Sequence, residues 1–350
     1  DEVTLRSNRR DLQQILLRQR VLKDVKDIST ETELFGMRCS LPAVLAPVGL
    51  SGLNARRGEV QAALAAEGRQ VPFVLSTMSV CGIQEVSEAV SNPVWFQLYM
   101  VKDRHFMIDL LNRVKQTGSE VLIVTVDLPK MGTRYRDFRS GLTGCTDFSC
   151  RLWRLWQILS RPRWIWDVGV MGGPHTLGNV TPLLGSDTGL EDFLDWTSKN
   201  FDPSATWNDL AFVRDNWPGK IVIKGILDPE DAKQAARCEV DGIVVSNHGG
   251  RQLDGVPSTV KALPAIVDTL GGALKILVDG GIRSGLDIIR MLALGADGVL
   301  IGRPWAYALG SKGEQGVRDV LGLLQEELNI AMALTGHNMI DTIDRKVLVE

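Results

Sequence analysis

Short apolar segments alternate along the chain with longer segments in which apolar residues recur every three or four positions. The short segments are rich in Val, Ile and Leu, a pattern typical of strands that are buried on both faces. Eight strands are predicted: Ala43–Val48, Phe73–Thr77, Trp95–Tyr99, Val121–Asp127, Ile221–Ile226, Gly242–His248, Lys275–Gly281 and Gly298–Arg303. Eight alternating strand–helix units predict an α/β fold, a (β/α)8 TIM barrel rather than an open doubly wound sheet.

The longer segments have the composition of helices, and most open with Asp, Ser or Pro and close near Gly, as helix caps do. Helices are predicted over Gly58–Glu67, Ile83–Val90, Arg104–Gln116, Pro229–Cys238, Thr259–Leu270 and Leu286–Leu294. Residues 1–40 form a polar segment before the barrel, in which we predict a short helix near Asp11–Arg18 followed by extended chain. Residues 1–350 are therefore expected to form a single domain.

One interval breaks the alternation. More than ninety residues separate Asp127, which ends the fourth predicted strand, from Ile221, which starts the fifth. This exceeds a normal βα loop, and we assign about residues 128–205 to an insertion. Its segment Arg151–Trp166 holds four Trp and four Arg in sixteen residues, which favours a segment at a membrane interface. A lid or an oligomer contact, where Trp and Arg are also enriched, is the alternative.

Charge and cysteine content exclude several classes of protein. The formal net charge of -3 argues against general nucleic-acid binding. The five cysteines are odd in number and show no C-x-x-C pair, which favours a reducing compartment and no metal site of the zinc type. They are Cys39, Cys81, Cys145, Cys150 and Cys238. No apolar run has the ~18 residues of a membrane-spanning helix.

Polar side chains gather at the carboxyl ends of the predicted strands, which in a barrel lie at one rim and carry the chemistry. They are Gln97, Tyr99, Thr125, Asp127, Arg134, Lys224, His248 and Arg251. Burying each without a partner would cost about 1–3 kcal/mol, so their common position favours a site. His248 and Arg251, separated by two glycines, suit a base beside an anion clamp. Taken alone, this stretch could equally be a capped surface turn with a solvated arginine.

The seventh and eighth strand ends predict a phosphate site. Asp279–Gly285 reads DGGIRSG, and Gly302 and Arg303 follow the eighth strand. The loops after these two strands form the recurrent phosphate site of (β/α)8 barrels, where backbone amides and arginines bind the oxygens. We therefore expect a phosphorylated cofactor or substrate. The chain does not open with G-x-G-x-x-G, which disfavours a nicotinamide cofactor in a Rossmann domain.

Several of these motifs together resemble the FMN-dependent α-hydroxy-acid dehydrogenase/oxidase family. They are WFQLY at 95–99, TVDLPKMGTR at 125–134, VIKGIL at 222–227, SNHGGRQLDG at 246–255 and DGGIR at 279–283. The similarity covers essentially the whole chain. Four further stretches resemble the bacterial respiratory, quinone-linked L-lactate dehydrogenases most: Ala43–Leu50, Asn54–Val60, Trp164–Gly169 and Pro174–Asn179.

The resemblance implies an FMN enzyme that oxidises an L-2-hydroxy acid, L-lactate above others, to the 2-oxo acid. It implies that His248 is the general base and that Asp127 orients its imidazole. Substrate contacts would come from Tyr99, Arg134 and Arg251. Contacts to FMN would come from Ser76, Gln97 and Thr125 at the pyrimidine edge, Lys224 near N1 and O2, Ser246, Asp279 at the ribityl chain, and Gly281, Arg283, Gly302 and Arg303 at the phosphate.

The resemblance also implies that electrons pass to a membrane quinone, that the protein is peripheral on the cytoplasmic face of the bacterial inner membrane, and that it is a homo-oligomer. An oxidase that uses oxygen is the first alternative, against which Gly49 and the Trp- and Arg-rich insertion argue. A truncated FMN-binding barrel and a flavin-linked isomerase are two others.

Two departures from the family pattern affect these expectations. Family members usually begin with a further segment that carries an active-site Tyr and a GGA turn, whereas this sequence starts at Asp1. One substrate contact is therefore expected to be absent. Gln70 stands where the family usually has Gly, and we expect a local effect on a helix end.

Overall fold

Eight parallel strands form the barrel predicted from the sequence. The computed structural model describes residues 2–140, 147–181, 196 and 199–349. The strands are β3 (Ala43–Leu45), β4 (Val74–Ser76), β5 (Trp95–Tyr99), β6 (Val121–Thr125), β7 (Lys220–Ile226), β8 (Gly242–Val245), β9 (Lys275–Val278) and β10 (Gly298–Ile301). Their order is β3-β10-β9-β8-β7-β6-β5-β4. A bridge between Leu45 and Phe73, with Leu45 N donating to Pro72 O at 2.9 Å, joins the two outer strands.

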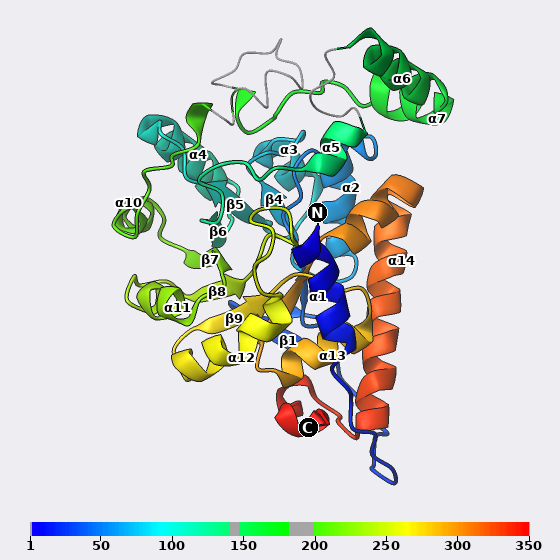
Figure 1. Cartoon of the computed structure of the whole chain (residues 1–350), viewed down its shortest axis with the longest axis vertical. Helices are drawn as coiled ribbons and strands as arrows, with labels where there is room; N and C mark the ends of the chain where they lie inside the picture. The colour runs from blue at the N-terminus through cyan, green and yellow to red at the C-terminus, as the bar shows by residue number, and fades with distance from the viewer. Residues whose placement is uncertain (1, 141–146, 182–195, 197–198, 350) are drawn as a thin grey trace.

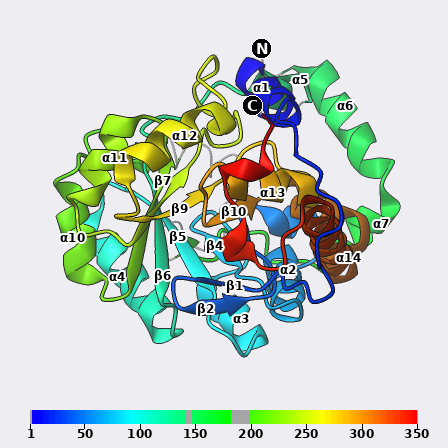
Figure 2. The same cartoon turned by 90° about the horizontal axis from the view of Figure 1, so that it is seen from below.

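Helices surround the barrel (Figures 1 and 2). They are α2 (Gly58–Glu67), α3 (Ile83–Ala89), α4 (Arg104–Gln116), α11 (Pro229–Ala236), α12 (Thr259–Leu270), α13 (Gly285–Ala293) and α14 (Arg303–Thr335), the last kinked at Lys312 and Gly313. Local capping explains several starts: Asp103 accepts from Phe106 N at 3.0 Å and Asp228 from Glu230 N at 2.8 Å. The six helices predicted between the strands agree with these bounds to within two residues, whereas α14 was not predicted.

A β-hairpin closes the amino-terminal end of the barrel. Its strands are β1 (Thr32–Leu34) and β2 (Met37–Cys39), which pair antiparallel. Leu34 and Cys39 join the apolar cluster inside the barrel, and Phe35 packs edge-on against Trp95 with ring centroids 5.7 Å apart. The hairpin therefore covers the barrel interior at the amino-terminal ends of the strands. The carboxyl ends of the strands form the open rim.

The helix predicted near Asp11–Arg18 is wrong in its position. Helix α1 spans Val3–Gln13, and it lies across the loops that follow β8 and β9 (Figure 1). Its first turn is capped from a distance, because the Asp254 carboxylate accepts from Val3 N at 3.1 Å and from Thr4 N at 2.8 Å. A cap that lies 250 residues away gives no local signal.

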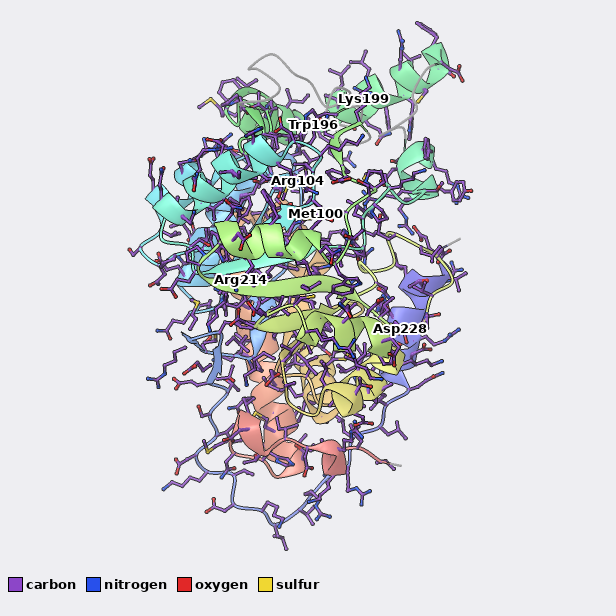
Figure 3. All side chains as sticks on the ribbon, turned by 90° about the vertical axis from the view of Figure 1, so that its left-hand side faces the viewer. Met100, Arg104, Trp196, Lys199, Arg214 and Asp228 are labelled. Carbon is purple, nitrogen blue, oxygen red and sulfur yellow. The ribbon has the colours of Figure 1, made fainter. Side chains whose placement is uncertain are left out.

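The insertion after β6 carries helices of its own: α5 (Tyr135–Arg139), α6 (Phe148–Leu159), α7 (Pro162–Trp164) and the π-helical turn η2 (Ile165–Val170). Helix α10 (Asp209–Asn216) follows the insertion and precedes β7. Helices α6 and α7 stand away from the barrel (Figure 1). Arg104, which Figure 3 labels, fixes the return to the barrel. Its Nη2 lies 2.8 Å from Asp202 Oδ2 and 2.7 Å from Asp209 Oδ1. Within the described residues, no helix is long and apolar enough to cross a membrane.

The cysteine pattern favoured a reducing compartment, whereas one of the described cysteines forms a disulfide. Cys150, in α6, is disulfide-bonded. Cys39, Cys81 and Cys238 are free thiols, and Cys145 lies outside the described residues. Neither the number nor the spacing of the cysteines indicated this bond.

Candidate active site

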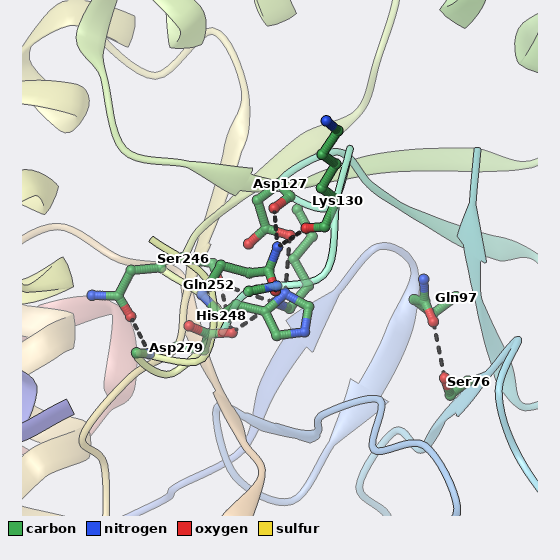
Figure 4. A network of polar contacts seen from close by, with 12 residues as sticks. Ser76, Gln97, Asp127, Lys130, Ser246, His248, Gln252 and Asp279 are labelled. Carbon is green, nitrogen blue, oxygen red and sulfur yellow. Dashed lines mark hydrogen bonds and ion pairs between the residues drawn. The ribbon is translucent and has the colours of Figure 1, made fainter. Parts of the chain in front are cut away.

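The rim of the barrel brings His248 against Asp127. His248 Nδ1 and Asp127 Oδ1 are 2.9 Å apart, and both side chains are largely shielded from solvent (Figure 4). Burial opposes ionisation of Asp127, but the charge of His248 and the hydrogen bond to it hold the pKa of this carboxyl below its ordinary value. With Nδ1 engaged, Nε2 is the ring nitrogen left to exchange a proton with a ligand.

Local backbone features make this approach possible. A bulge in β7 places Gly225 at a φ of +115°, and a Cβ there would lie 2.6 Å from the Cβ of Asp127. His248 itself has a φ of +56°, and its backbone N donates to Ser246 Oγ at 3.0 Å. A non-glycine residue in the left-handed region is strained, and such strain is tolerated where the surroundings hold it.

Gln252 ties the loop after β8 to the loop after β6. Its Nε2 donates to Asp127 O at 2.9 Å and to Lys130 O at 3.0 Å, and its Oε1 accepts from Gly132 N at 3.1 Å. Gln252 therefore fixes the backbone of the residue that orients His248. It was not among the predicted site residues, although its position within the SNHGGRQLDG motif was a usable signal.

Two guanidinium groups lie close to this pair. Burial and the neighbouring charge of Arg251 lower the pKa of Arg134. Among the described residues, Arg134 Nε has no hydrogen-bond partner, and Arg251 lies 3.7 Å from Asp137. Tyr99 stays a neutral phenol because desolvation raises its pKa to about 12. Two adjacent cations beside a neutral donor would bind a carboxylate.

A cavity of 1220 Å³ opens at this rim. Asp127, Arg134 and Arg251 line it, together with Arg136 and residues of α1 such as Leu5. It is large enough for a small organic acid and leaves room for a larger group beside it. The loop residues of the insertion and of the β8 motif therefore face one common space.

A buried charged network lies beneath the rim. Lys224 Nζ is 3.0 Å from Asp279 Oδ2 and donates to Ser246 Oγ at 2.9 Å, and Ser246 Oγ donates to Asp279 Oδ2 at 2.8 Å. Burial opposes the positive charge, but Asp279 and Asp127 raise the pKa of Lys224 above its ordinary value. A fixed positive charge is thus held inside the barrel.

Polar groups on neighbouring strands line up with this lysine. The strand register pairs Ser76 with Gln97, Tyr99 with Thr125, and Thr125 with Lys224. Ser76 Oγ donates to Gln97 Oε1 at 3.1 Å (Figure 4). Gln97 Nε2 and Asp279 Oδ1 are buried and have no partner among the described residues. Buried polar atoms normally have a partner, so these two point to a bound polar molecule.

The loops after β9 and β10 supply a cationic cradle. Gly281 has a φ of +87°, and Gly302 precedes the first turn of α14. The backbone N of Arg283 donates to Asp287 Oδ2 at 2.9 Å. Burial and neighbouring arginines lower the pKa of Arg283 and of Arg303. Arg303 donates to Gly249 O at 3.1 Å through both Nη atoms. Clustered, partly buried guanidinium groups at a helix start fit a phosphate.

The chemical types of these groups, and their order along the rim, fit the parts of FMN. The arginines after β9 and β10 suit its phosphate, the unpartnered Asp279 Oδ1 suits a ribityl hydroxyl, and the unpartnered Gln97 Nε2 suits a ring carbonyl. Lys224 lies between the last two in the strand order. All the predicted site residues therefore lie on one continuous rim, on or just after strands β4 to β10.

Comparisons with known proteins agree with this arrangement. Residues 1–350 match the family described as FMN-dependent dehydrogenase. The L-lactate dehydrogenase of Caulobacter sp. (strain K31) is 58% identical over 349 residues, covering 100% of this chain and 91% of that protein. The L-lactate dehydrogenase of Vibrio cholerae serotype O1 (strain M66-2) is 55% identical over 349 residues, covering 100% and 92%.

Two solved structures show the same fold. The monotopic membrane protein (S)-mandelate dehydrogenase has a TM-score of 0.93 and 34% identity, covering 100% of this chain and 91% of that chain. Mandelate oxidase with (S)-4-hydroxymandelic acid has a TM-score of 0.84 and 36% identity, covering 99% and 90%.

Proposed function

Because this chain belongs to the FMN-dependent dehydrogenase family, we propose that it oxidises an L-2-hydroxy acid, with L-lactate as the preferred substrate, to the corresponding 2-oxo acid. The observation that carries the proposal is the His248–Asp127 pair, 2.9 Å apart, together with the cavity that Asp127, Arg134 and Arg251 line. A base next to a carboxylate clamp is what a 2-hydroxy acid requires. The two relatives named L-lactate dehydrogenase support the choice of substrate.

In this proposal Arg134 and Arg251 bind the substrate carboxylate, and Tyr99 donates a hydrogen bond to it or to the hydroxyl. His248 Nε2 accepts a proton, from the hydroxyl oxygen if the α-hydrogen leaves as hydride, or from the α-carbon if it leaves as a proton. Asp127 stabilises the imidazolium that results. FMN, when bound, accepts the two electrons. Ser76, Gln97, Thr125, Lys224, Ser246 and Asp279 would hold its ring and ribityl chain, and Gly281, Arg283, Gly302 and Arg303 its phosphate.

We propose a membrane quinone as the electron acceptor. A steady-state assay with L-lactate and a soluble quinone analogue tests this, with hydrogen peroxide measured in parallel. We expect quinone reduction that greatly exceeds peroxide formation. Peroxide formed in air in a one-to-one ratio with pyruvate would instead establish an oxidase, the alternative that the similarity to mandelate oxidase favours.

We also propose that α6 and the residues after it lie on the membrane surface. Leu152, Trp153, Leu155, Trp156 and Leu159 are all exposed, and the rings of Trp153 and Trp156 stack with centroids 5.1 Å apart. Exposed Trp and Leu between arginines are typical of interfacial helices. The similar (S)-mandelate dehydrogenase is described as a monotopic membrane protein.

Co-sedimentation with vesicles that contain anionic lipid tests this surface. Replacing Trp153, Trp156, Trp164 and Trp166 by Ser should abolish most of the binding. Replacing Leu323 and Ile330 by Ser, two exposed apolar residues on α14, is the matched control and should change nothing. Vesicle binding that survives the four Trp replacements would refute the proposal.

A further inference from the structure

One segment inside the insertion makes a buried contact with the barrel. It runs from Pro174 to Thr181, and within it the side chain of Asn179 is 0% exposed. Asn179 Oδ1 accepts from Ile83 N at 2.8 Å, and Nδ2 donates to Ser76 O at 3.1 Å and to Ser79 Oγ at 2.9 Å. One amide thus binds the end of β4, the following turn and the first residue of α3.

The backbone beside Asn179 packs against the same turn. Gly178 N donates to Ser79 O at 3.2 Å and to Val80 O at 3.1 Å. A Cβ on Gly178 would collide with the backbone nitrogen of Gly82. Helix α3 has no side-chain cap from Gly82, so Asn179 supplies the missing acceptor from outside the helix.

The turn that Asn179 holds also shapes the proposed flavin pocket. Ser76 Oγ donates to Gln97 Oε1 and accepts from Met78 N at 3.2 Å (Figure 4). Met78 O accepts from Leu50 N at 2.9 Å, which joins this turn to the loop after β3. On its other side, Val80 N donates to the buried Glu59 Oε1 at 3.0 Å. Displacing the turn would therefore move Ser76 and the unpartnered Gln97 amide.

We propose that Asn179 is a positioning residue for the flavin site. It fixes the turn between β4 and α3 so that Ser76 and Gln97 present their polar groups to the cofactor. The inference rests on the proposed roles of Ser76 and Gln97 in binding FMN. The insertion then has two roles, because its helices α6 and α7 are exposed while its segment Pro174–Thr181 positions the cofactor pocket.

The test is the affinity of the full-length apoprotein for FMN. Asn179→Asp is nearly isosteric and keeps the acceptor for Ile83 N, but it replaces the Nδ2 donor by an oxygen that faces Ser76 O. We expect the FMN dissociation constant to rise about tenfold or more, the equivalent of one to two lost hydrogen bonds. Thr181→Val is the matched control, because it removes a bond within the same segment, from Thr181 Oγ1 to Leu177 O. It should leave the dissociation constant within about twofold of wild type.

The unfolding temperature of the apoprotein, as a second readout, separates a role in positioning the flavin site from a role in stability alone. A purely structural role would lower the unfolding temperature of the apoprotein and leave FMN affinity unchanged at temperatures where the protein is folded, and that result would overturn the proposal. Equal loss of affinity in Thr181→Val would overturn it too. If Asn179→Asp does not fold, the test uses Ser79→Ala, which removes the hydroxyl that accepts from Asn179 Nδ2. An FMN dissociation constant raised about threefold or more supports the inference, and a rise below about twofold refutes it.

The outcome is independent of the substrate. The ratio of dissociation constants between variant and wild type does not depend on which hydroxy acid is oxidised. Failure of L-lactate to reduce the wild-type flavin would count against the proposed function, whereas an unchanged ratio would count against Asn179 alone.

Discussion

Replacing Asp127 by Asn tests the proposed base directly. Asp127 Oδ1 lies 2.9 Å from His248 Nδ1, and the two side chains are 14% and 18% exposed. Asn can still accept a hydrogen bond from Nδ1, so the ring keeps its orientation, but the negative charge that stabilises the imidazolium is lost. A hydrogen bond to a charged group contributes about 1.5–3 kcal/mol. We therefore expect flavin reduction to slow by a factor of about ten to a hundred and fifty.

The assay is anaerobic rapid mixing of the FMN-loaded variant with saturating L-lactate, followed by flavin absorbance. Asp241→Asn is the matched control, because Asp241 accepts from Lys220 Nζ and Ile221 N, both at 2.9 Å, at the opposite end of β7. It should reduce its flavin at the wild-type rate. Reduction of the Asp127→Asn flavin at the wild-type rate would refute the assignment of Asp127.

Further predictions concern other parts of the structure. Lys224→Met should lower the flavin midpoint potential by about 30 mV or more in a potentiometric titration. For a two-electron couple, this shift corresponds to ~1.4 kcal/mol of charge stabilisation. An unchanged potential would contradict the proposal that the charge of Lys224 stabilises the reduced flavin. Arg134→Met should raise the KM for L-lactate about tenfold or more without weakening FMN binding, and an unchanged KM would exclude Arg134 from the substrate site. Gly285→Ala should lower the free energy of unfolding by about 1–3 kcal/mol in a urea titration, because a Cβ there would collide with the backbone of α14 at Leu328. Gly169→Ala, where the nearest atom is 4.0 Å away, is its control, and equal stability of the two variants would contradict this account.

The Asp127 carboxyl also predicts a pH dependence of stability. Its pKa is lowered on folding from an ordinary value of 3.8. A group of this kind contributes stability that is fully present above the ordinary pKa and is lost as the pH falls through the lowered one. The difference in unfolding free energy between wild type and Asp127→Asn should therefore shrink as the pH falls below about pH 4. Urea titrations across this range measure it, and a difference that does not change with pH would contradict the lowered pKa.

The sequence was informative where structure depends on neighbours along the chain. The strand from Trp95 to Tyr99 is a short, mostly apolar segment, and its predicted bounds agree with β5. Other strands were predicted too long. The strand ending at Asp127 was extended by two residues beyond β6. Val126 N still donates to Lys224 O on β7 at 3.0 Å, whereas Asp127 lies at the rim with its side chain against His248.

Contacts between segments that are distant along the chain could not be predicted from the sequence. The start of α1 depends on Asp254, and the cap of α3 on Asn179, which is 96 residues away from Ile83. Gln252 acts through backbone groups of Asp127 and Lys130, which no periodicity marks. Asp254, Asn179 and Gln252 are recognised only in the folded structure, because the fold brings their hydrogen-bond partners from distant segments next to them.

The most direct test of the account is the visible spectrum of the FMN-loaded protein, recorded without oxygen before and after the addition of L-lactate. We expect the yellow flavin to bleach on addition and pyruvate to form in an equal amount. A spectrum that stays unchanged with L-lactate, in a protein that binds FMN and is bleached by a chemical reductant, would contradict the claim that this site oxidises L-lactate.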